Sequence, residues 1–228
     1  FKGWKAQVSK TDFIEGTTLY EALEKFAKPP KRNTEAPVRV PINGVYKIKG
    51  VGDIITGRVE QGILRKDDLV GICPRNVTGC KVFSIEMHHK QWDEAGPGDN
   101  VGMSIKGLDK KNMPKPGDVI YLEKDGVLKP AKSFTAMVAV QEHPGQLKPG
   151  FNPLVHVRTA KDACKMTSIK WKMSKKTGTE KIPNPPFLEK GEQAEVTFEP
   201  NAPMFIESFK TCQGLGRIAV MDSNNLVM

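Results

Sequence analysis

The repeating pattern after Pro37 limits this chain to a narrow range of folds. Short apolar and β-branched runs follow one another there, and Gly, Pro, Asp and Asn separate them, as in the strands of a barrel or a sandwich. With 228 residues, the chain fits two all-β modules better than one α/β unit. The first series of expected strands is Val38–Val40, Ile54–Glu60, Asp68–Ile72, Lys81–His88, Asn100–Ile105 and Val119–Glu123. The second series is Phe134–Gln141, Pro153–Thr159, Met166–Met173, Ala194–Phe198, Met204–Phe209 and Gly216–Met221.

One helix is expected, near the start of the chain. Thr18 and Glu21 have the spacing of a capping box, in which each side chain bonds the backbone of the other residue. The apolar residues that share one helical face are Leu19, Ala22, Leu23 and Phe26. The two prolines of the Lys28–Lys31 segment then end the helix, because proline lacks an amide donor and clashes with the preceding turn.

Three regions follow from this pattern. We expect the helix and a charged, proline-containing linker in residues 1–36, one β module in residues 37–127 and a second in residues 128–228. The turn-rich segment Lys124–Pro130 separates the two series of strands and is the expected boundary between the modules.

The charge balance favours a polyanionic partner. Lys and Arg number 35 against 26 Asp and Glu, which gives a formal net charge of +9. Basic surfaces bind polyanions by releasing counterions, so nucleic acid is the first expected partner, and acidic filaments or membrane surfaces come second. A basic surface that is merely solvated is an equally good interpretation of the charge alone.

The cysteines and the hydropathy exclude several classes of protein. Cys73, Cys80, Cys164 and Cys212 occur singly, without a close CxxC pair, so we expect reduced, packed thiols in a cytoplasmic protein rather than a zinc or redox site. No apolar run approaches the ~20 residues that cross a bilayer, and no signal sequence opens the chain. Since Phe1 is not an initiator methionine, we expect a fragment or a processed product.

Three separated blocks carry a family likeness. They read VYKIKGVGDIITGRVEQG at Val45–Gly62, SIEMHHKQWDEAGPGDNVG at Ser84–Gly102 and EHPGQLKPGFNPLVHVRTA at Glu142–Ala160. In sequence, order and spacing these blocks resemble the alpha subunit family of eukaryotic translation elongation factor one. The resemblance covers essentially the whole chain, and it implies that the chain begins partway through a parent protein and stops short of its last strand.

The resemblance implies an all-β fold of two consecutive β-barrels, preceded by one helix from the end of a GTPase domain. Members of this family are GTPases that use GTP and Mg²⁺ and carry aminoacyl-tRNA to the A site of the ribosome. They also bind a guanine-nucleotide exchange factor and actin, and no membrane partner is implied. This chain has no GxxxxGK[ST] phosphate loop and no NKxD segment, so we expect neither a cofactor nor GTP hydrolysis in it. Gly50–Asp53 is expected to be a turn between strands.

The resemblance also implies a pocket on domain two for the terminal adenosine and the aminoacyl ester. Carried over position by position, its residues are Tyr46, Thr56, Glu86, His89 and Asn100. In this pocket an aromatic ring lies beside the aminoacyl group, and a carboxylate packs against the adenine. Aromatic and carboxylate side chains can stack on and orient a splayed base. Taken singly, each residue has a structural interpretation too, as a strand aromatic, a rim charge or a turn former.

Two features near this pocket bear on what it can bind. Gly44 stands where the family commonly has an acidic residue before the aromatic, which puts one polar contact to the acceptor end in question. His88 and His89 could be interpreted as metal ligands. Adjacent residues of a strand point to opposite faces, however, so we do not expect them to share an ion.

A stripe of lysines is expected in the second module. In SIKWKMSKK the alternation puts Ile169, Trp171 and Met173 on one face of a strand. The opposite face and the following turn then carry Ser168, Lys170, Lys172, Ser174, Lys175 and Lys176. Such a stripe suits contacts to the phosphates of a tRNA backbone, although an ordinary solvated strand face has the same pattern. Lys148 and Arg217 are further candidates, whereas Met221 replaces a basic residue that the family usually has.

Three other functions remain open from the sequence. A release-factor or ribosome-rescue homologue would share these barrels, although the MHH and HPGQ blocks favour the tRNA-delivery branch. A cytoskeletal scaffold could use its basic faces on actin. A free-standing enzyme is the weakest alternative, because the chain has four scattered histidines and neither a nucleophile elbow nor a metal cluster.

Overall fold

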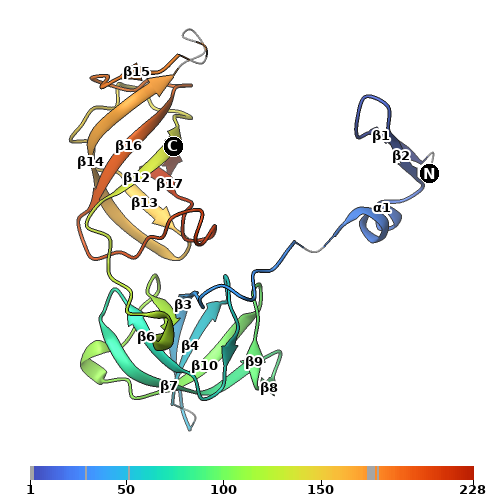
Figure 1. Cartoon of the computed structure of the whole chain (residues 1–228), viewed down its shortest axis with the longest axis vertical. Helices are drawn as coiled ribbons and strands as arrows, with labels where there is room; N and C mark the ends of the chain where they lie inside the picture. The colour runs from blue at the N-terminus through green and yellow to red at the C-terminus, as the bar shows by residue number, and fades with distance from the viewer. Residues whose placement is uncertain (1–2, 29, 51, 174–177, 179) are drawn as a thin grey trace. The chain divides into compact units, whose positions relative to one another are not determined.

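The protein consists mainly of strands, arranged in two compact units (Figure 1). The units are Phe1–Arg32 and Asn33–Met228. Within the described part of the chain, no helix is long and apolar enough to cross a membrane. The computed structural model describes all residues except 1, 2, 29, 51, 174–177 and 179.

The first unit contains the predicted helix and a hairpin that the sequence analysis missed. Its elements are β1 (Trp4–Gln7), β2 (Phe13–Gly16) and α1 (Leu19–Phe26). Thr18 caps α1 as expected, because its hydroxyl accepts a hydrogen bond from the Glu21 amide at 3.1 Å. The reciprocal half of the capping box does not form. The carboxylate of Glu21 instead accepts bonds from Thr17 and Lys25, and the bond from Lys25 is the largest cause that lowers the pKa of Glu21 to about 2.

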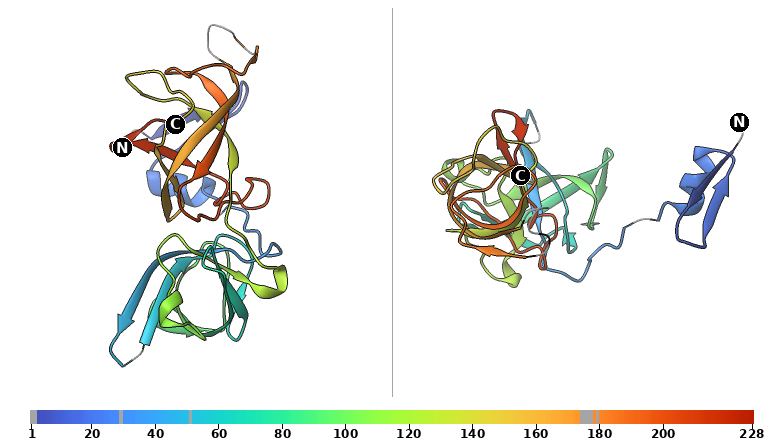
Figure 2. Two further views of the ribbon diagram at one scale, coloured as in Figure 1. Left: turned by 90° about the vertical axis from the view of Figure 1, so that its left-hand side faces the viewer. Right: turned by 90° about the horizontal axis from the view of Figure 1, so that it is seen from above.

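The first barrel, which we call barrel one, is a closed antiparallel sheet. The order β10-β4-β3-β11-β6-β7-β8 closes on itself because β10 also pairs with β7, and Figure 2 (left) looks into the resulting ring. Alternate residues of these strands fill one hydrophobic core between Val38 and Leu122. The strands are β3 (Val40–Ile48), β4 (Gly52–Arg58), β5 (Leu64–Arg65), β6 (Leu69–Cys73), β7 (Val77–Met87), β8 (Lys90–Trp92), β9 (Glu94–Ala95), β10 (Asn100–Lys106) and β11 (Val119–Leu122), and two 3-10 helices are η1 (Lys110–Asn112) and η2 (Glu123–Asp125).

The second barrel, barrel two, has the order β12-β16-β14-β13-β17-β18, with β15 paired to β14. Its two edges are linked where the Gln141 amide donates a hydrogen bond of 2.8 Å to the Val227 carbonyl. Phe198, Met166 and Leu188 are fully buried at its centre. The strands are β12 (Phe134–Ala139), β13 (Leu154–Val157), β14 (Ala160–Met173), β15 (Ile182–Pro183), β16 (Gln193–Pro200), β17 (Ala219–Asp222) and β18 (Asn225–Leu226). The expectation of two β-barrels is therefore confirmed.

Two of the expected strands were wrong. Val38–Val40 is only the approach to a strand, because β3 begins at Val40 and Arg39 makes a single bridge to Gln61. Met204–Phe209 is not a strand at all. Met204 and Phe205 are both buried although they are adjacent, so this segment lacks the alternation that a sheet requires, and the Met204 carbonyl bonds the amide of Ala131 in a connecting segment.

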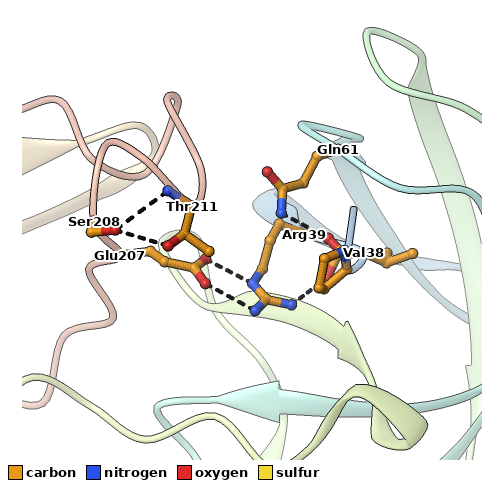
Figure 3. Close-up of polar contacts among 7 residues, drawn as sticks. Val38, Arg39, Gln61, Glu207, Ser208 and Thr211 are labelled. Carbon is orange, nitrogen blue, oxygen red and sulfur yellow. Dashed lines mark hydrogen bonds and ion pairs between the residues drawn. The ribbon is translucent and has the colours of Figure 1, made fainter. Parts of the chain in front are cut away.

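A buried ion pair joins the two barrels (Figure 3). The Arg39 side chain, before β3, is 5% exposed and donates two hydrogen bonds to the Glu207 carboxylate, at 2.8 Å from Nε and 3.0 Å from Nη2. Its Nη1 donates to the Val38 carbonyl at 2.9 Å. The Glu207 side chain, from the loop after β16, is 14% exposed. We call the Arg39–Glu207 pair the barrel clamp, and a second pair, Arg158 with Glu60, joins the barrels beside it.

The cysteines give a direct test of this packing. All four are buried free thiols, and burial raises the pKa of both Cys73 and Cys164 to about 12. A protonated, inaccessible thiol does not attack a disulfide reagent. We therefore expect no reaction with Ellman's reagent at pH 8 in the folded chain, and release of one equivalent per cysteine in guanidinium chloride. Rapid reaction of any thiol without denaturant would contradict this packing.

Candidate nucleic-acid interface

Two of the candidate residues, Thr56 and Glu86, belong to one row of paired residues across the outer face of barrel one. Gly44 of β3 lies opposite Thr56 of β4, which lies opposite Gly102 of β10. Gly102 in turn lies opposite Glu86 of β7. The chain neighbours of this row are buried in the core, namely Ile55, Met103 and Ile85. Because side chains alternate along a strand, the row faces outward. Gly102 contributes no side chain between Thr56 and Glu86, and Cγ2 of Ile54 lies 3.6 Å from where a Cβ of Gly102 would be.

Tyr46 and Asn100 lie on the same face as this row. Tyr46 is two residues after Gly44 on β3 and is 57% exposed. Asn100 is the first residue of β10, two residues before Gly102, and it is exposed. Residues i and i+2 of a strand share a face, so the barrel presents an aromatic ring, a carboxylate, a hydroxyl and an amide on one face. Tyr46 and Asn100 lie on opposite sides of the row, because Tyr46 pairs with Ile54 and Asn100 with Arg58. The Thr56 hydroxyl donates a long hydrogen bond of 3.4 Å to the Gly44 carbonyl, which holds it beside β3.

His88 and His89 form the two-residue turn between β7 and β8. Their φ angles of 51° and 60° are both left-handed, as in the type I′ turns that match the twist of a hairpin. The His89 side chain is fully exposed, with Nδ1 4.0 Å from Oε1 of Glu86, so the turn places an imidazole at the end of the row. Among the residues that the structure describes, no group of three or more His, Cys, Asp or Glu side chains could hold a metal ion.

The sequence analysis missed two members of this row. Gly102 separates Thr56 from Glu86, and Gln91 of β8 lies opposite Glu86 on the other side. Both could have been found from the sequence. Gly102 follows Asn100 by two residues, and a two-residue turn at His88 and His89 sets Gln91 opposite Glu86.

The predicted faces of the lysine strand in barrel two were wrong. The register of β14 against β16 shifts between Ile169 and Trp171, which leaves Lys170 as an extra residue in a β-bulge. The alternation therefore reverses. Trp171 lies opposite the half-buried Glu195, whereas Lys172 lies opposite the fully buried Ala194.

The two lysines consequently have different surroundings. Lys170 is 52% exposed, and its ammonium lies 3.0 Å from Glu195, which lowers the pKa of that carboxylate. Lys172 is only 12% exposed. Its ammonium lies 2.9 Å from Glu192, donates a 3.2 Å hydrogen bond to the Phe187 carbonyl and sits 4.7 Å from the centre of the Phe187 ring. Lys172 is thus a largely buried cation paired with Glu192, and Lys170 is an exposed cation paired with Glu195.

The remaining basic candidates lie on loops of barrel two. Lys148 is exposed in the turn before β13, and the Arg217 guanidinium stacks 5.2 Å from the centre of the Phe209 ring, before β17. Met221 lies on β17 opposite Leu154. Lys175 and Lys176 lie outside the described residues.

Comparisons with known proteins agree on the class of protein. Residues 133–228 match the family model for the GTP-eEF1A C-terminal domain, and residues 52–121 match the one for elongation factor Tu domain 2. The chain is 41% identical over 227 residues to elongation factor 1-alpha, oocyte form, of Xenopus laevis, with 100% of this chain and 48% of that protein covered.

Solved structures give the same fold. The chain resembles sup35 complexed with GMPPNP and sup35 complexed with GDP, each with a TM-score of 0.77 and 26% identity. Each match covers 94% of this chain and 51% of the other. The chain therefore spans about half the length of the relatives that it matches.

Proposed function

Since this chain belongs to the family of elongation factor 1-alpha and elongation factor Tu, we propose that its two barrels bind the charged end and the adjoining stem of an aminoacyl-tRNA. The observation that carries this proposal is the outward row on barrel one. Thr56 and Glu86 flank the bare backbone of Gly102, and Tyr46 and Asn100 lie on the same face.

The chemistry of this face suits the end of an RNA strand. Unstacked bases are read by aromatic rings and by polar side chains that reach their edges. Glu86 is 58% exposed and can accept a hydrogen bond from an exocyclic amine or a ribose hydroxyl. Asn100, at the start of β10, and His89, in the turn after β7, can supply donors for the ester that joins the amino acid to the terminal ribose.

Barrel two supplies positive charge for the tRNA backbone in this proposal. Lys148 and Lys170 are exposed cations that can contact phosphates, and Arg217 is a further candidate. Lys172 is a weaker candidate, because Glu192 already holds its ammonium. We keep residues 1–36, 37–127 and 128–228 as the proposed domain limits, and the two separate sheets support the division between the barrels. Cys73, Val119 and Tyr121 of barrel one pack with the core of barrel two across this division.

We further propose that the chain acts within a longer cytoplasmic protein that binds GTP and Mg²⁺ and delivers aminoacyl-tRNA to the ribosome. The length of the Xenopus laevis relative, of which this chain spans 48%, supports that proposal. An exchange factor and actin are proposed partners of the same protein, on the strength of the family alone.

Replacing Glu86 by alanine tests the proposed acceptor-end site. In the intact protein, Glu86→Ala is expected to lower the preference for aminoacylated over uncharged tRNA by about 1–3 kcal/mol. In this proposal only the charged end docks on this face, so the lost contact to its adenosine weakens charged tRNA alone, while the phosphate contacts of both remain. The measurement is the ratio of the two affinities at one salt concentration, with the fold checked by thermal melting.

Glu94→Ala is the matched control, since Glu94 is an exposed carboxylate of the same barrel, and it pairs with the exposed residue Arg65. Its ratio should stay at the wild-type value. If Glu86→Ala lowered both tRNA affinities equally, or neither, Glu86 would be a structural rim residue.

A release-factor or ribosome-rescue role is the second candidate. A protein with that role has no need to distinguish charged from uncharged tRNA, so the same ratio of affinities in the wild-type protein separates the two functions. Salt-dependent cosedimentation with actin filaments separates either of them from a scaffold role.

A further inference from the structure

Gly44 is buried although it belongs to the outward-facing row, and the ring of Tyr46 covers it. A Cβ atom built on Gly44 would lie 2.7 Å from Cε2, 2.8 Å from Oη and 2.9 Å from Cζ of Tyr46. Real Cβ atoms essentially never approach other atoms below 3.0 Å. The ring of Tyr46 therefore folds back along β3 and lies directly on the backbone of the glycine.

Glycine is required at this position by the space that the Tyr46 ring occupies. It is not required by the backbone conformation. Gly44 has no left-handed φ angle, so an L-residue can adopt its conformation. The three nearest atoms to the added Cβ all belong to Tyr46. At Gly57 of the same barrel, by contrast, the nearest atom is the backbone carbonyl of Pro41 at 2.7 Å. A methyl group at residue 44 would thus displace a movable side chain and leave the sheet in place.

We infer that Gly44 is a positioning residue for the proposed aminoacyl-end site. Because it has no side chain, the Tyr46 ring can lie against the backbone of β3, with its exposed part beside Thr56. This inference rests on the proposed function. An exposed aromatic side chain normally loses rotamer freedom when a ligand binds, which costs affinity. A ring that already lies against the strand avoids part of that loss.

The glycine also accounts for a departure from the resembled family. The resembled family commonly has an acidic residue at this position, and its absence here implies the loss of one polar contact. Any side chain at residue 44 would occupy the space that the ring fills here. In this chain, the proposed site therefore lacks that polar contact and has the Tyr46 ring against the backbone of Gly44 instead.

The first test observes the ring itself. The protein is labelled with 3-fluorotyrosine, and the ¹⁹F signals of Tyr20, Tyr46 and Tyr121 are assigned with Tyr46→Phe and Tyr20→Phe. Gly44→Ala is expected to shift the Tyr46 signal and leave the other two in place. Gly96→Ala is the matched control, because its Cβ would meet only Asp99 at an ordinary 3.9 Å. It should shift none of the three.

The second test connects the ring to binding. The probe is an RNA hairpin with a single-stranded ACCA end that carries phenylalanine through a stable amide. Its affinity for the intact protein is measured with and without GTP. Gly44→Ala is expected to weaken binding roughly three- to tenfold. In a Tyr46→Ala background the same change is expected to have no effect, because the ring through which Gly44 acts is gone.

The two tests distinguish a failure of the positioning role of Gly44 from a failure of the proposed function. An unmoved Tyr46 signal, an unchanged affinity, or the same loss of affinity with and without the Tyr46 ring would each overturn the positioning role. If the wild-type protein bound the charged and uncharged hairpins equally, the proposed function would fail, and the role of Gly44 at an aminoacyl end would fail with it. The fluorine shift would then still report whether the ring depends on the glycine.

Discussion

Replacing Arg39 by alanine is expected to lower the free energy of unfolding by about 3–5 kcal/mol. The truncation leaves the Glu207 carboxylate in a site where it is 14% exposed, without the two hydrogen bonds that the guanidinium provides. An unpaired charge in such a site cannot recover its hydration, and this penalty exceeds the value of the lost contact. Urea denaturation followed by tryptophan emission gives the measurement.

Arg65→Ala is the control for the barrel clamp. Arg65 pairs with Glu94 at 3.1 Å, but both side chains are more than half exposed, so its loss should cost less than about 1 kcal/mol. The double change Arg39→Met with Glu207→Leu is expected to restore much of the stability, because it removes both charges together. Equal losses in Arg39→Ala and Arg65→Ala would show that the barrels do not depend on the clamp.

Lys172→Ala is expected to destabilise the chain by about 3 kcal/mol, while Lys170→Ala costs less than about 1 kcal/mol. The reason is burial, since Lys172 and Glu192 are 12% and 11% exposed, whereas the Lys170 side chain is 52% exposed. Thermal and urea unfolding of the two single variants make the comparison. The lysines are two residues apart on one strand, so each serves as the control for the other.

RNA binding by the same two variants tests the alternative hypothesis, in which Lys172 contacts phosphate. If Lys172→Ala left the unfolding curve unchanged and flattened the salt dependence of RNA affinity, Lys172 would be a phosphate contact, as the sequence suggested. That result would also mean that its pairing with Glu192 opens when RNA binds.

The alternation of apolar and polar residues was enough to predict the barrels and most of their strands. Asn100–Ile105 lies close to the observed β10, because apolar and polar or glycine positions alternate in it without interruption. Ile54–Glu60 overlaps the observed β4 as well. The row across the barrel did not follow from this alternation, because β4 and β10 are far apart in the chain and a register shift precedes Gly44 in β3.

The failures have one physical origin, which is that a bulge or a tertiary partner leaves no mark in a local pattern. The segment around Lys170 alternates cleanly, yet one extra residue in the ladder reverses its faces. Arg39 stands between two valines, and its partner Glu207 is 168 residues away. A charged residue inside an apolar run is a signal of a buried pair, but the sequence alone does not identify the partner.

The turn at His88 and His89 concentrates backbone strain at one edge of barrel one. Both residues adopt left-handed φ angles although neither is glycine, at a cost of roughly 1 kcal/mol each. Asparagine followed by glycine would relax this turn, and would also remove both imidazoles. The backbone is therefore held at higher energy within three residues of Glu86. At this edge of barrel one, the two imidazoles are therefore presented at the cost of backbone strain in the turn that carries them.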